Sequence, residues 1–153
     1  MAEQRNKIAR VATGVAGLDR ILGGGVLMSG VYIAMGFPGA GKTTLGNQIA
    51  FHHVANGGRA LYVTLLAESH ARMLQHLETL SFYDPKRVGR ELSYVSAFNL
   101  IESDGLKGIL ALLREQVREN KISLVVIDGL ANPMVRPGAK IVPQMGQIKA
   151  EGN

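Results

Sequence analysis

Hydrophobic and polar positions follow two different rhythms along the chain. Four short runs are apolar or nearly so, and they occupy residues 31–35, 60–66, 92–95 and 124–127. Their length favours strands over helices, and continuous hydrophobicity is typical of parallel strands that are covered on both faces. These runs predict the strands of a mainly parallel sheet.

The segments between the runs show helical spacing instead. The clearest helix follows Ser103 or Asp104, either of which can cap it, and its apolar residues repeat at i, i+3, i+4, i+7 and i+11: Leu106, Ile109, Leu110, Leu113 and Val117. Three further helices are predicted from the same spacing: a short one within 13–25, one over 42–56, and one capped by Ser69 and broken at Asp84.

Strands that alternate with helices predict an α/β fold class with helices flanking the sheet. A length of 153 residues with 46% hydrophobic content suits one domain with a real core. We expect a short arm over residues 1–12 and the domain over residues 13–131. Three prolines and no periodicity over residues 132–153 predict a loosely ordered tail.

Composition narrows the classes of function. The chain has no cysteine, which excludes disulfides and thiolate metal sites and favours a cytoplasmic location. We expect no membrane span. The net charge of +5 suits an anionic ligand, but the basic residues are scattered and no aromatic residues alternate with them, so the signal for nucleic-acid binding is weak. The four histidines lack chelate spacing, and we expect them to be structural or exposed.

A glycine-rich run after the first predicted strand carries the strongest chemical signal. It matches the phosphate-loop pattern G-x-x-x-x-G-K-S/T at every position: Gly36, Phe37, Pro38, Gly39, Ala40, Gly41, Lys42 and Thr43. Backbone N–H groups of such a loop, together with a helix N-terminus, form a cradle for phosphate oxygens. We expect Lys42 to reach the β- and γ-phosphates of a nucleotide, Thr43 to ligate Mg²⁺, and Thr44 to contact the phosphates nearest the ribose.

Two carboxylates follow other predicted strands. Asp128 ends the run 124–127, which is the Walker B pattern, and it is a candidate Mg²⁺ ligand acting through water. Taken alone, it could equally begin a turn with Gly129. Glu68 lies just past the run 60–66 and is a candidate catalytic residue that orients or deprotonates water. Its alternative role is to favour the N-terminal end of a helix dipole.

Taken together, these motifs resemble the RecA-superfamily P-loop ATPases of the KaiC type. The resemblance rests on the opening run 13–25, with its Thr-Gly start and Gly-Gly-Gly end, the phosphate loop with Lys42, Thr43 and Thr44, residues 62–69, and the strand that ends at Asp128. It implies a RecA-like P-loop NTPase core that binds ATP and Mg²⁺ and assembles as a homo-oligomer or with a partner protein. It also implies that Glu68 is the catalytic glutamate.

The sequence departs from the family at two places. The family often has two glutamates after the second strand, and here Glu68 stands alone. The family also continues past the Walker B strand with a helix and further strands, whereas residues 129–153 show no buried strand. We therefore expect an incomplete sheet, as in a truncated or frameshifted member or a fragment that a partner completes.

The function predicted from the sequence is ATP binding, with Mg²⁺-dependent hydrolysis as the ancestral activity and a role in ATP-driven signalling or assembly. The alternatives are a nucleotide-responsive binding module without turnover and an accessory ATPase of DNA recombination or repair.

Overall fold

The computed structural model describes residues 8–66 and 70–130. The elements follow one another in this order: β1 (Arg10–Val11), α1 (Ala16–Ile21), β2 (Val26–Leu27), α2 (Lys42–Ala55), β3 (Ala60–Thr64), α3 (His70–Leu77), the 3-10 turn η1 (Pro85–Arg87), β4 (Leu92–Ser96), α4 (Phe98–Ser103), α5 (Gly105–Asn120) and β5 (Leu124–Asp128). The α/β prediction is confirmed.

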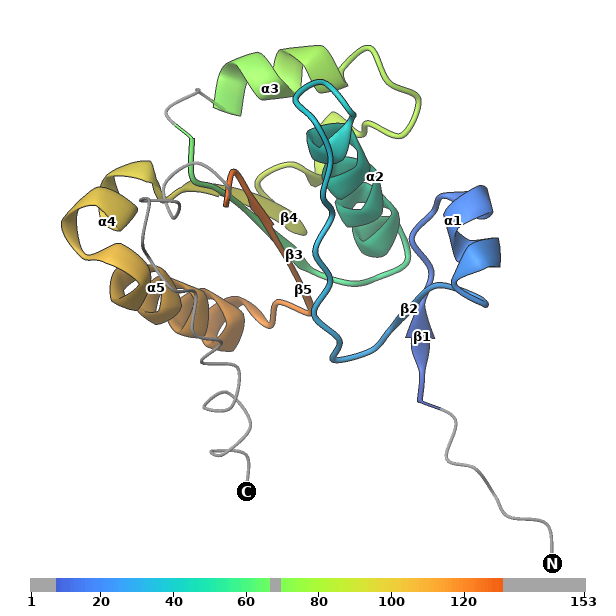
Figure 1. The fold of residues 1–153 in the computed structure, drawn as a ribbon, viewed down its shortest axis with the longest axis horizontal. Coiled ribbons are helices and arrows are strands. Elements are labelled where there is room, and N and C mark those ends of the chain that lie inside the picture. The colour runs from blue at the N-terminus through green and yellow to red at the C-terminus, as the bar shows by residue number, and fades with distance from the viewer. Residues whose placement is uncertain (1–7, 67–69, 131–153) are drawn as a thin grey trace, which may run out of the picture.

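Within the described residues, the main sheet has three strands in the order β4-β3-β5, and both pairings are parallel (Figure 1). In its register Thr64 of β3 lies opposite Ser96 of β4 and opposite Asp128 of β5. The carboxyl ends of all three strands therefore meet at one edge. Ligands of open α/β sheets bind at this edge, because the loops that leave it are free to vary.

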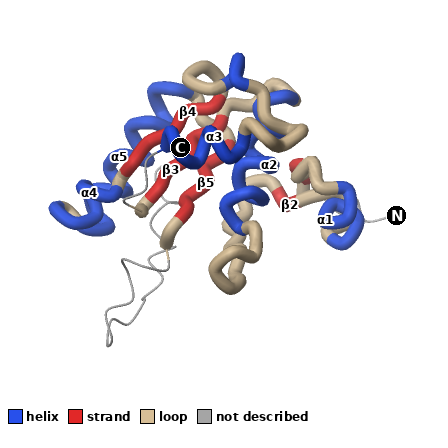
Figure 2. Tube along the Cα trace, turned by 90° about the horizontal axis from the view of Figure 1, so that it is seen from above, coloured by secondary structure: helices blue, strands red, loops and turns tan. Residues whose placement is uncertain are grey.

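Helices cover both faces of the sheet, and successive residues of β3 face opposite layers. Ala60 and Tyr62 belong to a core cluster with α2 and α3, whereas Leu61, Val63 and Leu65 pack with α4 and α5. All of β3 is buried. Figures 1 and 2 show α2 lying between the sheet and the N-terminal elements, with α4 and α5 on the far side of the sheet.

The opening motif docks on the outer side of α2. Asp19 accepts hydrogen bonds from the backbone N–H of Thr13 at 2.8 Å and from its hydroxyl at 2.7 Å, and these bonds lower the pKa of Asp19. A Cβ added at Gly14 would lie 2.5 Å from the ring of His52 on α2, so only glycine permits this approach. This contact fixes the chain that leads toward the phosphate loop.

The predicted strand at residues 31–35 is wrong. The segment has no strand assignment, no strand within the described residues pairs with it, and Val31, Ile33 and Met35 are 74%, 75% and 89% exposed. A strand needs a neighbour to pair its N–H and C=O groups, and apolar composition alone supplies none. The segment is instead held near β2, where the N–H of Leu27 donates to the Tyr32 hydroxyl at 2.7 Å.

Other boundaries also differ from the predictions. β3 ends at Thr64, and α3 ends at Leu77 instead of continuing toward Asp84, although Leu80 still packs on the core from the following turn. α4 was not predicted, and Asp104 precedes α5 without a side-chain capping bond. β1 lies inside the expected arm. Within residues 8–66 and 70–130, every helix is too short or too polar to span a bilayer.

Candidate functional site

The phosphate loop closes directly onto the start of α2. Gly39 and Gly41 have φ of 79° and 85°, a left-handed conformation that side chains disfavour, and Gly41 is the N-cap of α2 without any side-chain capping bond. The first N–H groups of a helix have no partner inside it. The N-terminus of α2 therefore presents backbone donors and the positive end of its dipole to whatever lies above the loop.

Lys42 lies across this loop. Its Nζ donates to the carbonyl oxygens of Gly36 at 2.8 Å and Phe37 at 2.9 Å. The side chain of Lys42, the first residue of α2, thus connects the start of this helix to the two residues that begin the loop. Gly36 is tightly placed as well, since a Cβ there would stand 3.2 Å from the Cβ of Ala40. Pro38 belongs to the exposed part of the loop.

Thr43 and Asp128 meet although they are far apart in the sequence. The Thr43 hydroxyl donates to Oδ2 of Asp128 at 2.7 Å. Asp128 is the last residue of β5, and the next residue, Gly129, has φ of 90° and lies against Leu66. The contact between Thr43 and Asp128 joins the phosphate loop to the edge where the strands end.

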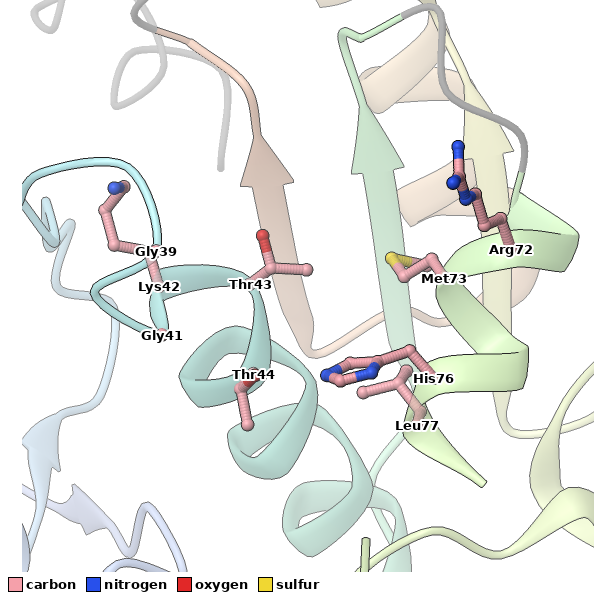
Figure 3. Close-up of a pocket in the computed structure, with 9 residues that line it drawn as sticks. All are labelled: Gly39, Gly41, Lys42, Thr43, Thr44, Arg72, Met73, His76 and Leu77. Carbon is pink, nitrogen blue, oxygen red and sulfur yellow. The ribbon is translucent and has the colours of Figure 1, made fainter. Parts of the chain in front are cut away.

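A cavity of about 490 Å³ lies between the loop and α3. Figure 3 shows Lys42, Thr43 and Thr44 on one side of it and Arg72, Met73 and His76 of α3 on the other. Sequence reasoning missed the α3 residues. The available signal was positional, because a helix that follows a strand end at this edge has its first turns beside the loop.

A buried polar network lies beneath α2. The Tyr62 hydroxyl donates to Oδ2 of Asp128 at 3.0 Å, and the Tyr94 hydroxyl donates to Oδ1 of Asn47 at 2.7 Å. Asn47, which is fully buried, donates in turn to the carbonyl of Thr43 at 2.9 Å. Burial raises the pKa of both tyrosines, and for Tyr62 the charge of Asp128 adds to the effect. Both phenols therefore remain protonated donors.

Glu68 lies outside the described residues. The chain on either side of it is anchored, because Nε2 of His70, at the start of α3, lies 2.8 Å from the Thr64 hydroxyl at the end of β3. Burial lowers the pKa of His70, so the neutral imidazole is favoured in this contact. His70 is thus a structural histidine, as expected.

The oxygen donors at the loop suit a hard divalent cation. Mg²⁺ is held in proteins by one or two carboxylate or hydroxyl oxygens together with substrate phosphates and water, rather than by a full protein cage. Thr43 and Asp128 provide such a pair. Within the described ranges no group of three or more His, Cys, Asp or Glu residues is placed to hold an ion.

Comparison with known proteins gives a consistent result. The family model described as "ATPase: KaiC" matches residues 11–141. The chain is 28% identical to a UPF0273 protein of Thermotoga maritima, over 93% of this chain and 64% of that protein. It is 31% and 32% identical to the circadian clock oscillator proteins KaiC of Synechococcus elongatus and Thermosynechococcus vestitus, over 84% of this chain and 24% of each of them. The chain belongs to the KaiC family of ATPases.

Proposed function

We propose that this chain binds ATP together with Mg²⁺ at the loop 36–44 and hydrolyses it. The observation that carries the proposal is the 2.7 Å contact between the Thr43 hydroxyl and Asp128, which brings the end of the phosphate loop to the carboxyl end of β5. If residues 36–43 were only a glycine-rich turn that binds no ligand, a contact between Thr43 and Asp128 would not be expected. Membership in an ATPase family supports the same conclusion.

Each residue of the loop has a role in this proposal. The N–H groups of residues 36–44 and the dipole of α2 receive phosphate oxygens, and Lys42 exchanges its carbonyl partners for the β- and γ-phosphates. Thr43 would contribute its hydroxyl oxygen to Mg²⁺ while its O–H continues to donate a hydrogen bond to Asp128. Mg²⁺, when bound, neutralises charge on the phosphates. Asp128 holds the water shell of the cation.

Glu68 is the proposed general base. It follows β3, whose last residue lies opposite Asp128 in the register. A carboxylate at this edge has the chemistry needed to orient and deprotonate the attacking water, provided that it comes within hydrogen-bond reach of that water. The water oxygen bonds to the γ-phosphorus as the bond to the bridging oxygen of ADP breaks, so the products are ADP and inorganic phosphate, and the proton of the water passes to Glu68 and then to solvent.

Nucleotide binding is tested by Lys42→Ala. A hydrogen bond to a charged partner contributes about 1.5–3 kcal/mol, so we expect the affinity for a fluorescent ATP analogue to fall by at least about tenfold. Lys107→Ala, an exposed lysine on α5 far from the loop in sequence, is the matched control and retains the parent affinity. If Lys42→Ala binds ATP as well as the parent, the proposal is wrong.

Hydrolysis is tested separately, in single-turnover reactions with Glu68→Gln. We expect the variant to bind ATP normally and to lose about a hundredfold or more in rate, the scale of general base catalysis. Turnover that survives the substitution removes Glu68 from the mechanism. A parent protein that binds ATP without any turnover is a nucleotide-responsive binding module instead.

We further propose that ATP serves assembly or signalling, with a second copy or a partner protein completing the site. Support comes from the clock oscillator relatives, of which this chain spans about a quarter. Light scattering with and without Mg-ATP tests the proposal, and a mass that stays constant contradicts assembly.

The alternative function in DNA recombination or repair is tested by measuring DNA binding across salt concentrations. Binding that does not depend on salt, or no binding at all, would exclude this alternative.

A further inference from the structure

We infer that Tyr62 is a positioning residue for Asp128: its buried hydroxyl fixes the carboxylate in the orientation in which Asp128 serves the cation site. This inference rests on the proposed function. It deepens that proposal by naming a residue on the central strand, outside the phosphate loop, that tunes Mg²⁺ affinity without contacting nucleotide.

The register of the sheet explains why Tyr62 reaches Asp128. Tyr62 lies opposite Val126 on β5, so Asp128 is its diagonal neighbour toward the carboxyl ends of the strands. Long aromatic side chains span such diagonals. Oδ2 of Asp128 accepts from Tyr62 at 3.0 Å and from Thr43 at 2.7 Å, so two donors on different elements hold one oxygen. Among the residues that the structure describes, no donor is hydrogen-bonded to the other oxygen, Oδ1, which can therefore serve the cation site.

Packing holds the Tyr62 hydroxyl in place. The side chain is fully buried, and its ring lies 5.3 Å from that of Tyr94 on β4. α2 approaches so closely that a Cβ added at Gly46 would lie 3.3 Å from the Tyr62 hydroxyl. A donor confined in this way loses little entropy when it holds its acceptor, and outer-shell partners of this kind alter metal affinity when they are removed.

Phenylalanine would fill the same volume, so the hydroxyl itself must explain the tyrosine. A hydroxyl buried under α2 needs a partner, and its best partner is the carboxylate at 3.0 Å, because the alternative acceptor, the carbonyl of Thr43, is 3.4 Å away. The Tyr62 hydroxyl therefore donates its one hydrogen bond to the Asp128 carboxylate.

Tyr94 offers a matched control. It lies on the neighbouring strand, faces the same layer, and donates from the hydroxyl of a partly buried side chain, but to Asn47 instead of Asp128. Tyr94→Phe removes a bond of the same chemistry from the same core and leaves the carboxylate untouched. A purely structural role for the tyrosine hydroxyls would make the two substitutions equivalent.

The experiment compares Tyr62→Phe, Tyr94→Phe and the parent chain. Affinity for a fluorescent ATP analogue is measured in EDTA and across a Mg²⁺ titration, and Mn²⁺ binding to the nucleotide complex is followed by electron paramagnetic resonance. In EDTA we expect equal affinities. With metal, Tyr62→Phe should need about tenfold more cation for half-saturation, the scale of lost outer-shell partners. Tyr94→Phe should match the parent.

Combination with Asp128→Asn shows whether Tyr62 acts through Asp128. We expect Tyr62→Phe to cause no further loss in that background. An unchanged metal requirement in Tyr62→Phe, an equal shift in Tyr94→Phe, or a full additional loss in the Asp128→Asn background would overturn the inference. If the parent binds nucleotide and Tyr62→Phe behaves like it, only this inference fails; if the parent binds none, the proposed function fails and this inference with it.

Discussion

Two segments of similar composition adopt different structures in this molecule. Residues 31–35 (Val-Tyr-Ile-Ala-Met) and β3 (Ala-Leu-Tyr-Val-Thr) are both short, apolar and contain one tyrosine. β3 is paired on both sides and buried, whereas residues 31–35 are exposed and pair with no strand of the described chain. The difference lies in their neighbours, because a strand is stable only when other strands satisfy its backbone groups.

The two tyrosines make the same point at the level of single atoms. Tyr62 in β3 donates to Asp128 and is fully buried, whereas Tyr32 is 52% exposed and accepts from the backbone of Leu27. The same side chain on two similar segments is therefore a hydrogen-bond donor in a buried site in one case and an exposed acceptor in the other. In β3 the sheet supplies a carboxylate at the end of the adjacent strand, whereas no strand of the described chain pairs with residues 31–35.

Truncation of one large side chain in each segment gives the largest expected contrast. Leu61→Ala in β3 leaves a cavity between the sheet and α5, and we expect it to cost about 2–5 kcal/mol of unfolding free energy. Ile33→Ala, at 75% exposure, should change that free energy by less than about 0.5 kcal/mol. Urea unfolding at two protein concentrations measures both, and equal costs would show that residues 31–35 are packed in solution.

The contrast also shows what the sequence could reveal. Periodicity located β3, β4, β5, α2 and α5, because burial of one or both faces leaves a direct trace in the order of residues. The motif placed Lys42, Thr43 and Asp128 at one edge, since strand ends of a parallel sheet must meet there.

Other features depend on partners that no local pattern contains. The strand at residues 31–35 failed because pairing is a property of two segments, whereas the pattern describes one. The hydrogen bond from Tyr62 to Asp128 could not be predicted from the sequence, because it depends on the register of β3 and β5, which places Asp128 two residues beyond the partner of Tyr62. The α3 residues at the cavity depend on how one helix lies over the loop.

A smaller effect on the free energy of unfolding is expected where α2 packs on the sheet. Residues 31–35 are exposed, and no helix of the described chain covers them in this way. Gly46→Ala should destabilise the chain by about 1–3 kcal/mol, although alanine is the better helix former, because its Cβ would lie 3.2 Å from Val126 and 3.3 Å from Tyr62. Gly17→Ala in α1 is the control, since a Cβ there meets nothing within 4 Å. Thermal unfolding should show opposite signs, and stabilisation of both variants would mean that α2 packs less closely.

The smallest effect concerns pH and the end of β3. Burial lowers the pKa of His70 in the folded chain, so between this pKa and the unfolded value of about 6.5 the unfolded chain binds more protons. The stability that His70 provides is therefore complete above pH 6.5 and is lost as the pH falls through the folded pKa. His53, whose pKa burial also lowers, contributes with the same sign. Residues 31–35 contain no group of this kind.

Urea unfolding between about pH 8 and 5.5 measures this loss, above the range in which carboxylates titrate. We expect His70→Gln to reduce the slope of unfolding free energy against pH, and His53→Gln to reduce it separately, because each removes one group whose protonation favours the unfolded chain. Thr64→Val should lower stability at neutral pH by leaving Nε2 of His70 without its partner. A slope that is the same in His70→Gln and the parent would mean that water reaches His70 at the end of β3 as freely as it reaches residues 31–35. The contrast between the two segments would then not extend to the edge where the strands end.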